Sequence, residues 1–287
     1  MSAPLEAPAA PLGILAGLGD LPVQVAAAAR ERGQPVYILR LKGFVEPQLA
    51  DYPGEIVALA ELGKIYSAFR KAGCRQICFA GIVKRPDLAA LKPDLKGLSL
   101  LPKVIAAASQ GDDALLQLMV KSFEAEGFEI IGADVAAGHL QAASGLFAGA
   151  PPDETSLGDL RKAAHIASQL GRLDIGQGAI VCRGLVLCVE AQEGTDRMLA
   201  RCADLPDAVR GTIGSPHGVL VKRPKPQQDR RIDLPAIGLA TLNGAYQAGL
   251  KGIGYEAGGA LLLNADALHE RATELGLFLY GFPGDWS

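Results

Sequence analysis

Short apolar runs and amphipathic segments alternate through the first half of the chain. Runs that fit buried strands lie at residues 12–16, 35–41, 76–80 and 128–132. Segments with helical periodicity lie between or before them, at residues 23–33, 62–73 and 112–127. Strands that alternate with helices in this way build a parallel sheet covered by helices on both faces. The pattern therefore predicts an α/β protein whose N-terminal domain, residues 12–141, is Rossmann-like.

The pattern changes after residue 136, where glycine, alanine and proline cluster as they do in linkers. We predict a linker at residues 142–154, followed by a mixed α/β catalytic domain at 155–282. Its strands are expected at 178–183, 185–189, 219–222, 261–263 and 277–280, the first two forming a hairpin that turns at Arg183–Gly184. Its helices are expected at 156–170, 195–203, 239–250 and 266–275.

The amino-acid composition limits the classes of function and the cellular compartment that we expect for this chain. The chain is 49% hydrophobic but only 5% aromatic, and a net charge of −3 argues against non-specific nucleic-acid binding. The five cysteines show no CxxC spacing, which favours buried thiols in a cytoplasmic protein. Residues 1–11 lack a basic region and an unbroken apolar core, so we expect a disordered tail and not a signal peptide.

A glycine turn follows the first predicted strand. Gly17 and Gly19 precede a helix, and free amides together with the helix dipole can bind an anion there. However, Pro22 occupies the third glycine position of the dinucleotide fingerprint, and Arg40 and Lys42 stand where an acid would bind a ribose. These departures argue against NAD binding. A nucleotide or phosphate contact and a purely structural turn both remain open.

Two further segments of the first domain carry candidate ligand contacts. Lys84 and Arg85 follow the strand at 76–80, on the sheet edge where ligands of open α/β sheets collect. They are candidates for phosphate binding, and the alternative is a solvated basic loop. Asp112 opens a helix, where it either caps free amides or contacts a ligand.

The second domain contains an unusual segment at 221–238, VKRPKPQQDRRIDLPAIG. Its prolines exclude a regular helix or a central strand. Cations and carboxylates stand side by side in it, as expected where phosphate and a metal ion are handled together. The basic residues are Lys222, Arg223, Lys225, Arg230 and Arg231, and the acids are Asp229 and Asp233.

A second acidic segment lies at 190–196, EAQEGTD, between a predicted strand and a helix. Carboxylates such as Glu190 and Glu193 are the oxygen ligands that Mg²⁺ or Mn²⁺ prefers. The alternative is a helix cap with solvated acids, which suits Asp196 better than Glu190. Gln177, in the turn before the hairpin, is placed either to reach a ligand or to shape the turn.

Six segments together resemble one family of proteins: AGLGDLP, FAGIVKRP, GDDALL, RLDIGQGAIV, VEAQEGTD and KRPKPQQDRRIDLPAIG. In order and spacing they resemble the LpxI-type UDP-2,3-diacylglucosamine pyrophosphatases of lipid A biosynthesis, and the resemblance covers residues 12–280. The chain departs from the family at Leu18, where the family usually has glycine, and in its extended N-terminal tail.

The resemblance implies hydrolysis of UDP-2,3-diacylglucosamine to UMP and 2,3-diacylglucosamine 1-phosphate (lipid X), assisted by a divalent metal. It implies that the lipid-linked substrate lies between the two domains and that water attacks the phosphorus on the glucosamine side. Asp233 matches the catalytic aspartate of the family. We expect Asp233 to ligate Mg²⁺ or Mn²⁺ or to orient the water, with Glu190 or Glu193 completing the metal shell.

We expect Lys222, Lys225 and Arg231 to bind phosphate oxygens, since the bridge of a pyrophosphate diester is highly anionic. Two other classes of function are weighed against this one. They are a nicotinamide-dependent oxidoreductase and a non-catalytic binder of a nucleotide-linked lipid. A homodimer and a peripheral contact with the inner membrane are left open by the sequence.

Overall fold

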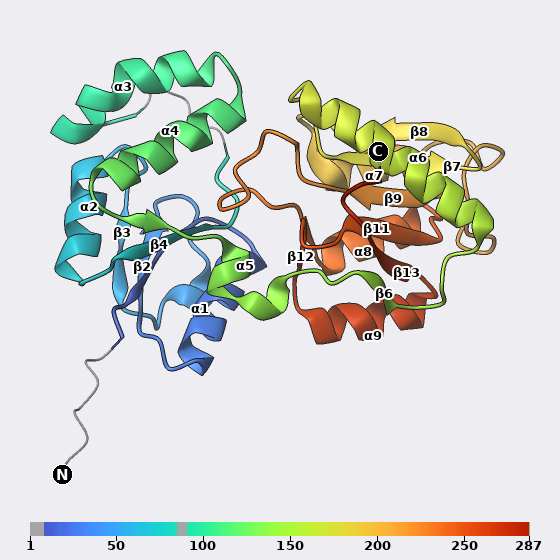
Figure 1. The fold of residues 1–287 in the computed structure, drawn as a ribbon, viewed down its shortest axis with the longest axis horizontal. Coiled ribbons are helices and arrows are strands. Elements are labelled where there is room, and N and C mark those ends of the chain that lie inside the picture. The colour runs from blue at the N-terminus through green and yellow to red at the C-terminus, as the bar shows by residue number, and fades with distance from the viewer. Residues whose placement is uncertain (1–8, 85–90, 287) are drawn as a thin grey trace, which may run out of the picture. The chain divides into compact units, whose positions relative to one another are not determined.

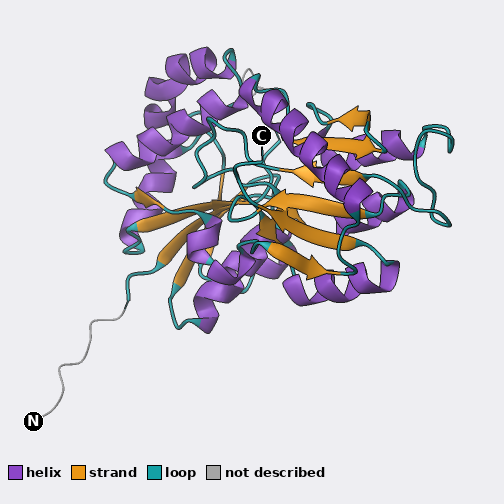
Figure 2. Ribbon diagram, turned by 45° about the vertical axis from the view of Figure 1, so that its right-hand side comes forward, coloured by secondary structure: helices purple, strands orange, loops and turns teal. Residues whose placement is uncertain are grey.

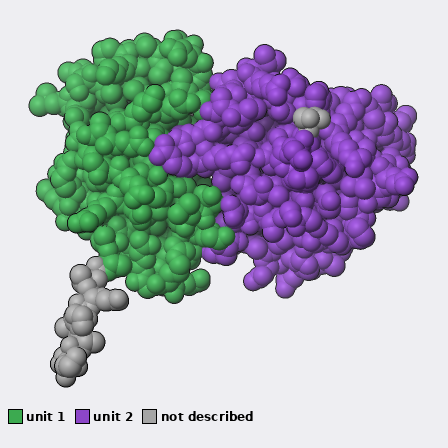
Figure 3. All heavy atoms as spheres, in the orientation of Figure 1, with its two compact units in different colours: residues 1–138 green, residues 139–287 purple. Residues whose placement is uncertain are grey.

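The computed structural model describes residues 9–84 and 91–286, so most of the predicted tail and Arg85 lie outside the described residues. The chain forms two compact units, Met1–Gly138 and His139–Ser287, drawn in separate colours in Figure 3. The order of elements along the chain can be followed in Figure 1. Each unit has a sheet and a core of its own, and each is described by itself.

Unit 1 is built on a five-stranded parallel sheet in the order β3-β2-β1-β4-β5. The chain turns from one half of the sheet to the other between β1 and β4, which confirms the Rossmann-like prediction. The strands are β1 (Leu12–Ala16), β2 (Val36–Leu41), β3 (Gly54–Val57), β4 (Gln76–Ala80) and β5 (Glu129–Ile130).

Helices lie on both sides of this sheet (Figure 2). α1 packs with α5, and α3 packs with both α2 and α4. An aromatic cluster fills the core beneath α2 and α4, where Tyr66 meets Phe123 edge to face with 4.9 Å between ring centroids. The helices are α1 (Asp20–Glu31), α2 (Leu62–Lys71), α3 (Leu95–Ala108), α4 (Asp112–Ala125) and α5 (Ala133–Ala136), with 3₁₀ turns at Pro47–Leu49 (η1) and Gly138–Leu140 (η3).

Unit 2 contains a mixed six-stranded sheet in the order β6-β13-β11-β9-β7-β8. The three central strands β13, β11 and β9 are parallel, whereas β6, β7 and β8 run antiparallel to their neighbours. The strands are β6 (Gly145–Ala148), β7 (Gly178–Cys182), β8 (Leu185–Val189), β9 (Val219–Lys222), β11 (Gly252–Glu256) and β13 (Phe278–Phe282). The short strands β10 (Ala236–Ile237) and β12 (Leu261–Leu262) pair separately.

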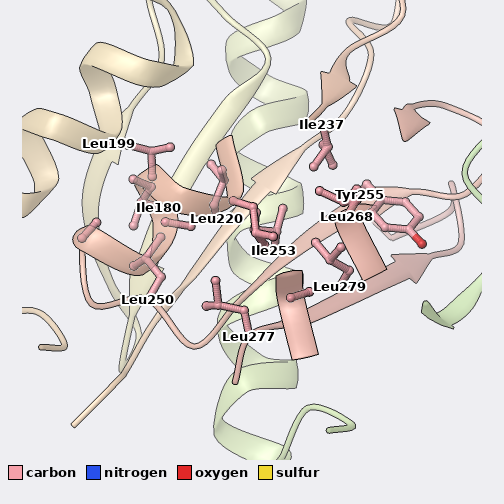
Figure 4. Close-up of a cluster of buried hydrophobic side chains, with 14 of the residues drawn as sticks. Ile180, Leu199, Leu220, Ile237, Leu250, Ile253, Tyr255, Leu268, Leu277 and Leu279 are labelled. Atoms are coloured by element: carbon pink, nitrogen blue, oxygen red, sulfur yellow. The ribbon is translucent and has the colours of Figure 1, made fainter. Parts of the chain in front are cut away.

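Two apolar clusters, one on each face, stabilise this sheet. The larger includes Ile180, Leu220, Ile253 and Leu279, which are labelled in Figure 4. Buried residues of α7 (Gly194–Ala203), α8 (Leu239–Gln247) and α9 (Ala265–Leu275) complete this cluster. The smaller lies under α6 (Glu154–Arg172). All five cysteines are free and buried. In the part of the chain that the structure describes, no helix has the length and hydrophobicity needed to span a membrane.

The prediction of a linker at 142–154 is wrong. β6 lies inside this range and pairs with β13, and Asp153 caps α6 by accepting a hydrogen bond from Ser156 N at 2.8 Å. Gly149 in this range allows two backbone segments to approach closely and does not provide a flexible link. A β-carbon on Gly149, whose φ is 75°, would lie 2.2 Å from the Leu277 carbonyl oxygen.

Candidate functional site

The candidate residues of unit 2 converge on one edge of its sheet. The carboxyl end of β9 lies beside the start of β7 because Lys222 is in register with Gly178. The end of β8 reaches the same edge, where Val189 pairs with Ala179. Gln177, Glu190 and Lys222, which are far apart in the sequence, therefore share this edge.

Lys222 is the buried cation of this edge. Its ammonium donates to the Ala236 carbonyl oxygen at 3.0 Å and so joins the end of β9 to the segment just after Asp233. Burial lowers the pKa of Lys222, and the nearby carboxylates of Glu190, Asp196 and Asp233 oppose that shift. The structure thus places Glu190 and the predicted catalytic Asp233 within electrostatic reach of one lysine.

Two acceptor oxygens at this edge are buried without a hydrogen-bond partner among the described residues. They are Glu190 Oε2 and Gln177 Oε1. The other oxygen of Glu190 accepts from Thr195 Oγ1 at 2.7 Å, which fixes the carboxylate. Leaving a buried acceptor unpaired costs about 1–3 kcal/mol. The two oxygens are therefore poised to receive a donor or a cation from a ligand.

The other predicted phosphate-binding cations of the loop 223–235 have carboxylate partners in this structure. Lys225 Nζ lies 2.6 Å from Asp174 Oδ1. Arg231 donates to both oxygens of Asp229, with 2.7 Å from Nη2 to Oδ2, and this pairing holds the pKa of Asp229 below its usual value. A phosphate would have to share these cations with acids that already hold them.

A buried ion-pair network that the sequence did not indicate anchors the same loop. Arg223 donates to Glu256 Oε2 at 2.8 Å and to the carbonyl oxygens of Trp286 and Gly284 at 2.7 and 3.1 Å. Arg230 reaches the other oxygen of Glu256 at 2.7 Å. Glu256 ends β11, a strand missing from the prediction, so its role had no visible signal in the sequence.

The predicted metal ligands differ in how well they fit a cation. Glu193 is directed to Arg201, with 2.6 Å between Oε1 and Nη2, and that hydrogen bond lowers the pKa of Glu193. Within residues 9–84 and 91–286, no group of three or more acids, histidines or cysteines could hold a metal ion. Glu190, with its unpaired oxygen, and Asp233 still fit Mg²⁺, which is usually held by one or two carboxylates together with substrate phosphates and water.

The glycine turn of unit 1 is occupied by contacts within the chain. The amides of Gly17 and Leu18 donate to carbonyl oxygens at the end of β4 and just beyond it, at 2.8 and 3.0 Å. Gly19 N donates to Glu46 Oε1 at 2.6 Å. A β-carbon on Gly17 would lie 2.6 Å from the Ile82 carbonyl oxygen. These amides are used within the chain, so an anion that binds to Gly19 N must displace the Glu46 carboxylate.

Glu46 is a second residue that the sequence analysis missed. It lies five positions beyond β2, past Arg40 and Lys42, the residues that stand where an acid would bind a ribose. Of the remaining candidates, Lys84 is exposed beyond the carboxyl end of β4, and Asp112 is the first residue of α4. Arg85 lies outside the described residues, so the predicted basic pair is described only for Lys84.

Comparisons with known proteins cover both units. The model of the LpxI N-terminal domain matches residues 11–140, and the model of the LpxI C-terminal domain matches residues 143–280. The chain is 50% identical, over 270 residues, to the UDP-2,3-diacylglucosamine pyrophosphatase LpxI of Caulobacter vibrioides. That alignment spans 94% of this chain and 96% of the relative.

Proposed function

This chain belongs to the LpxI family, and we propose that it hydrolyses the pyrophosphate of UDP-2,3-diacylglucosamine. Water adds to one phosphorus, the bridging P–O bond breaks, and UMP and 2,3-diacylglucosamine 1-phosphate leave. The observation that best supports a hydrolytic site is the edge of the sheet in unit 2. There Lys222 is buried with the carboxylates of Glu190 and Asp233 within electrostatic reach.

In this proposal Asp233 accepts a proton from the attacking water or orients it toward phosphorus. A carboxylate can act as a general base, and a base held beside the nucleophile lowers the free energy of the transition state. The ammonium of Lys222 stabilises the negative charge that develops on the phosphate oxygens, and its burial makes this interaction stronger than it would be in bulk water. Attack on the phosphorus at the glucosamine side is our expectation, and mass spectrometry after hydrolysis in ¹⁸O water tests it.

We further propose that Mg²⁺ or Mn²⁺ takes part, held by Asp233 and Glu190 together with phosphate oxygens. The ion would neutralise charge on the pyrophosphate. The unpaired oxygen of Glu190 and the excess of carboxylates over Lys222 support this view. Chelation with EDTA should abolish UMP release, and added Mg²⁺ or Mn²⁺ should restore it. Full turnover in EDTA would refute the metal requirement.

The central experiment compares Asp233→Asn with Asp229→Asn, two substitutions in the same loop. We expect Asp233→Asn to lower kcat for UMP release by at least about 100-fold while substrate binding persists, since loss of a positioned base costs about 10²–10⁴-fold. Asp229 holds Arg231, so its substitution should change KM more than kcat. Equal turnover by Asp233→Asn and the unmodified chain would exclude the proposed role of Asp233.

A non-catalytic binder of a nucleotide-linked lipid is distinguished by the same assay. Such a protein would bind the substrate yet release no UMP with either metal. A nicotinamide-dependent reaction has less support, because the glycine turn that would face the dinucleotide already uses its amides within the chain. Titration with NADH and NADPH, followed by fluorescence, tests that alternative directly.

A further inference from the structure

Helix α3 of unit 1 carries apolar side chains on the face turned to solvent. It packs against α2 and α4, and only Gly97 and Ala108 of its described residues are buried (Figure 1). Leu95, Leu98 and Ile105 are 88%, 56% and 53% exposed. Residues 95, 98, 102 and 105 are spaced three, four and three apart, so they form one stripe along the helix. We call these four positions the α3 stripe.

The charged side chains on α3 itself are positive. The helix itself contains no acid, and Asp94 before it is used as its cap, accepting from Gly97 N at 2.8 Å. Lys96 lies beside Glu126, with 2.5 Å between their charged atoms. Lys103 on the helix and Lys92 just before it are exposed. Ser99, also on the solvent side, satisfies its hydroxyl by donating to the Lys96 carbonyl oxygen at 2.7 Å.

We propose that the α3 stripe docks on the surface of an anionic phospholipid bilayer. A contiguous apolar patch on a solvent-exposed surface marks an interaction site. Apolar residues flanked by lysines are typical of a helix that lies in a membrane interface. The two exposed lysines complement the negative charge of lipid head groups. At 14 residues, about 21 Å long, the helix is too short to span the bilayer and suits a position parallel to its surface.

Only the role of this docking rests on the proposed function: it would bring the active site to a substrate with two acyl chains. The binding itself is tested without substrate. The intact chain is sedimented with vesicles of phosphatidylglycerol and phosphatidylcholine, and with vesicles of phosphatidylcholine alone. We expect the Leu98→Asp/Ile105→Asp variant to lose at least ten-fold in partitioning to the anionic vesicles. Lys103→Glu should weaken binding to the anionic vesicles while leaving any binding to neutral vesicles unchanged.

Val135→Asp is the matched control, since Val135 is 68% exposed on α5 of the same unit and lies outside the stripe. It should bind vesicles as the unmodified chain does, and thermal unfolding should show that all variants are folded. Equal partitioning of the double variant and the control would overturn the proposal. So would a change of the double variant from dimer to monomer in solution, which would assign the stripe to a second copy of the chain.

Turnover of detergent-dispersed substrate separates membrane docking from direct binding of the acyl chains. We expect the double variant to hydrolyse dispersed substrate at the unmodified rate and vesicle-borne substrate at least ten-fold more slowly. Equal loss in both conditions would assign the stripe to the acyl chains and overturn the proposal. If the unmodified chain releases no UMP yet partitions to vesicles through the stripe, the proposed function fails and the docking surface stands.

Discussion

Replacing Glu256 by alanine should destabilise unit 2 because it leaves a buried guanidinium without its counter-charge. Glu256 and Arg223 are 4% and 8% exposed, and 2.8 Å separates Glu256 Oε2 from Arg223 Nη2. Removing one partner of a buried ion pair costs about 3–5 kcal/mol. Arg223 keeps its hydrogen bonds to three backbone carbonyl oxygens, so we expect a loss at the lower end, about 3 kcal/mol of the free energy of unfolding.

The chain contains its own probe for this measurement. Trp286, its single tryptophan, stacks on Phe282 with 5.3 Å between ring centroids, and its carbonyl accepts from Arg223. Tryptophan fluorescence in a urea titration therefore reports on unit 2 at the network itself. Urea is preferable to guanidinium because it does not screen ion pairs. Circular dichroism followed in parallel reports on both units and shows whether they unfold in one transition.

Arg230→Ala is the control, since it removes the other ion pair of the same carboxylate. The Arg230 side chain is 57% exposed, and an exposed pair contributes about 0–1 kcal/mol. A joint Arg223→Met/Glu256→Leu change should recover much of the loss, because it removes both buried charges and fills part of the space. If Glu256→Ala lowers the free energy of unfolding no more than Arg230→Ala does, then Glu256 is not the counter-charge of a desolvated guanidinium.

Two further predictions concern the site and the core of unit 1. In Gly178→Ala the new β-carbon would lie 2.6 Å from Glu190 Oε2 and force that carboxylate to move. We therefore expect the rate of UMP release to fall about ten-fold with little change in thermal stability. Unchanged turnover would contradict a role for this oxygen. Burial raises the pKa of the Cys78 thiol from 9.0 to about 12, so the folded state keeps a proton that the unfolded state loses. The free energy of unfolding of the unmodified chain should therefore fall, relative to Cys78→Ala, by about 1.4 kcal/mol per pH unit above pH 9, and parallel pH profiles of the two proteins would refute this.

Elements bounded by clear turn signals were predicted to the residue. The strands at 12–16, 76–80, 185–189 and 219–222 have the same limits in the structure. The hairpin turn at Arg183–Gly184 is also confirmed, with positive φ at both residues. In these places a run of apolar residues ends at a glycine, proline or charged residue, so local composition alone decides the boundary.

The central strand β11 was missed because its sequence, GIGYE, looks like a loop. Its glycines are required by neighbours that the sequence cannot show. A β-carbon on Gly252 would lie 2.4 Å from the Phe278 ring, and one on Gly254 would lie 2.4 Å from Leu160 Cδ2. Helix α3 was also missed. It contains Gly97 and Pro102, two residues that disfavour a helix interior and so favour a loop when the sequence is read alone.

In the candidate site, too, features set by neighbouring residues could be predicted, and contacts between residues distant in the sequence could not. The composition of the segment 221–238 indicated a loop that handles charge, and its register beside Gln177 and Glu190 supports that reading. The partners of its cations could not be read from spacing, because Arg223 meets a residue 33 positions away and Lys225 one 51 positions away. The fold brings both acids to the loop. Asp174 lies in the segment RLDIGQGAIV, whereas Glu256 lies outside all six segments.

The pairing of charges in this loop bears on how a pyrophosphate could bind. Four of its five basic residues, Arg223, Lys225, Arg230 and Arg231, already have carboxylate partners in the chain. Lys222 is buried beside acids, and burial holds its pKa down. An anionic ligand at this edge would thus meet more negative than positive charge unless it displaces internal acids or brings a cation with it. A divalent ion shared between Asp233 and the phosphates would remove that repulsion, so the charges that the fold assembles support the proposed metal requirement.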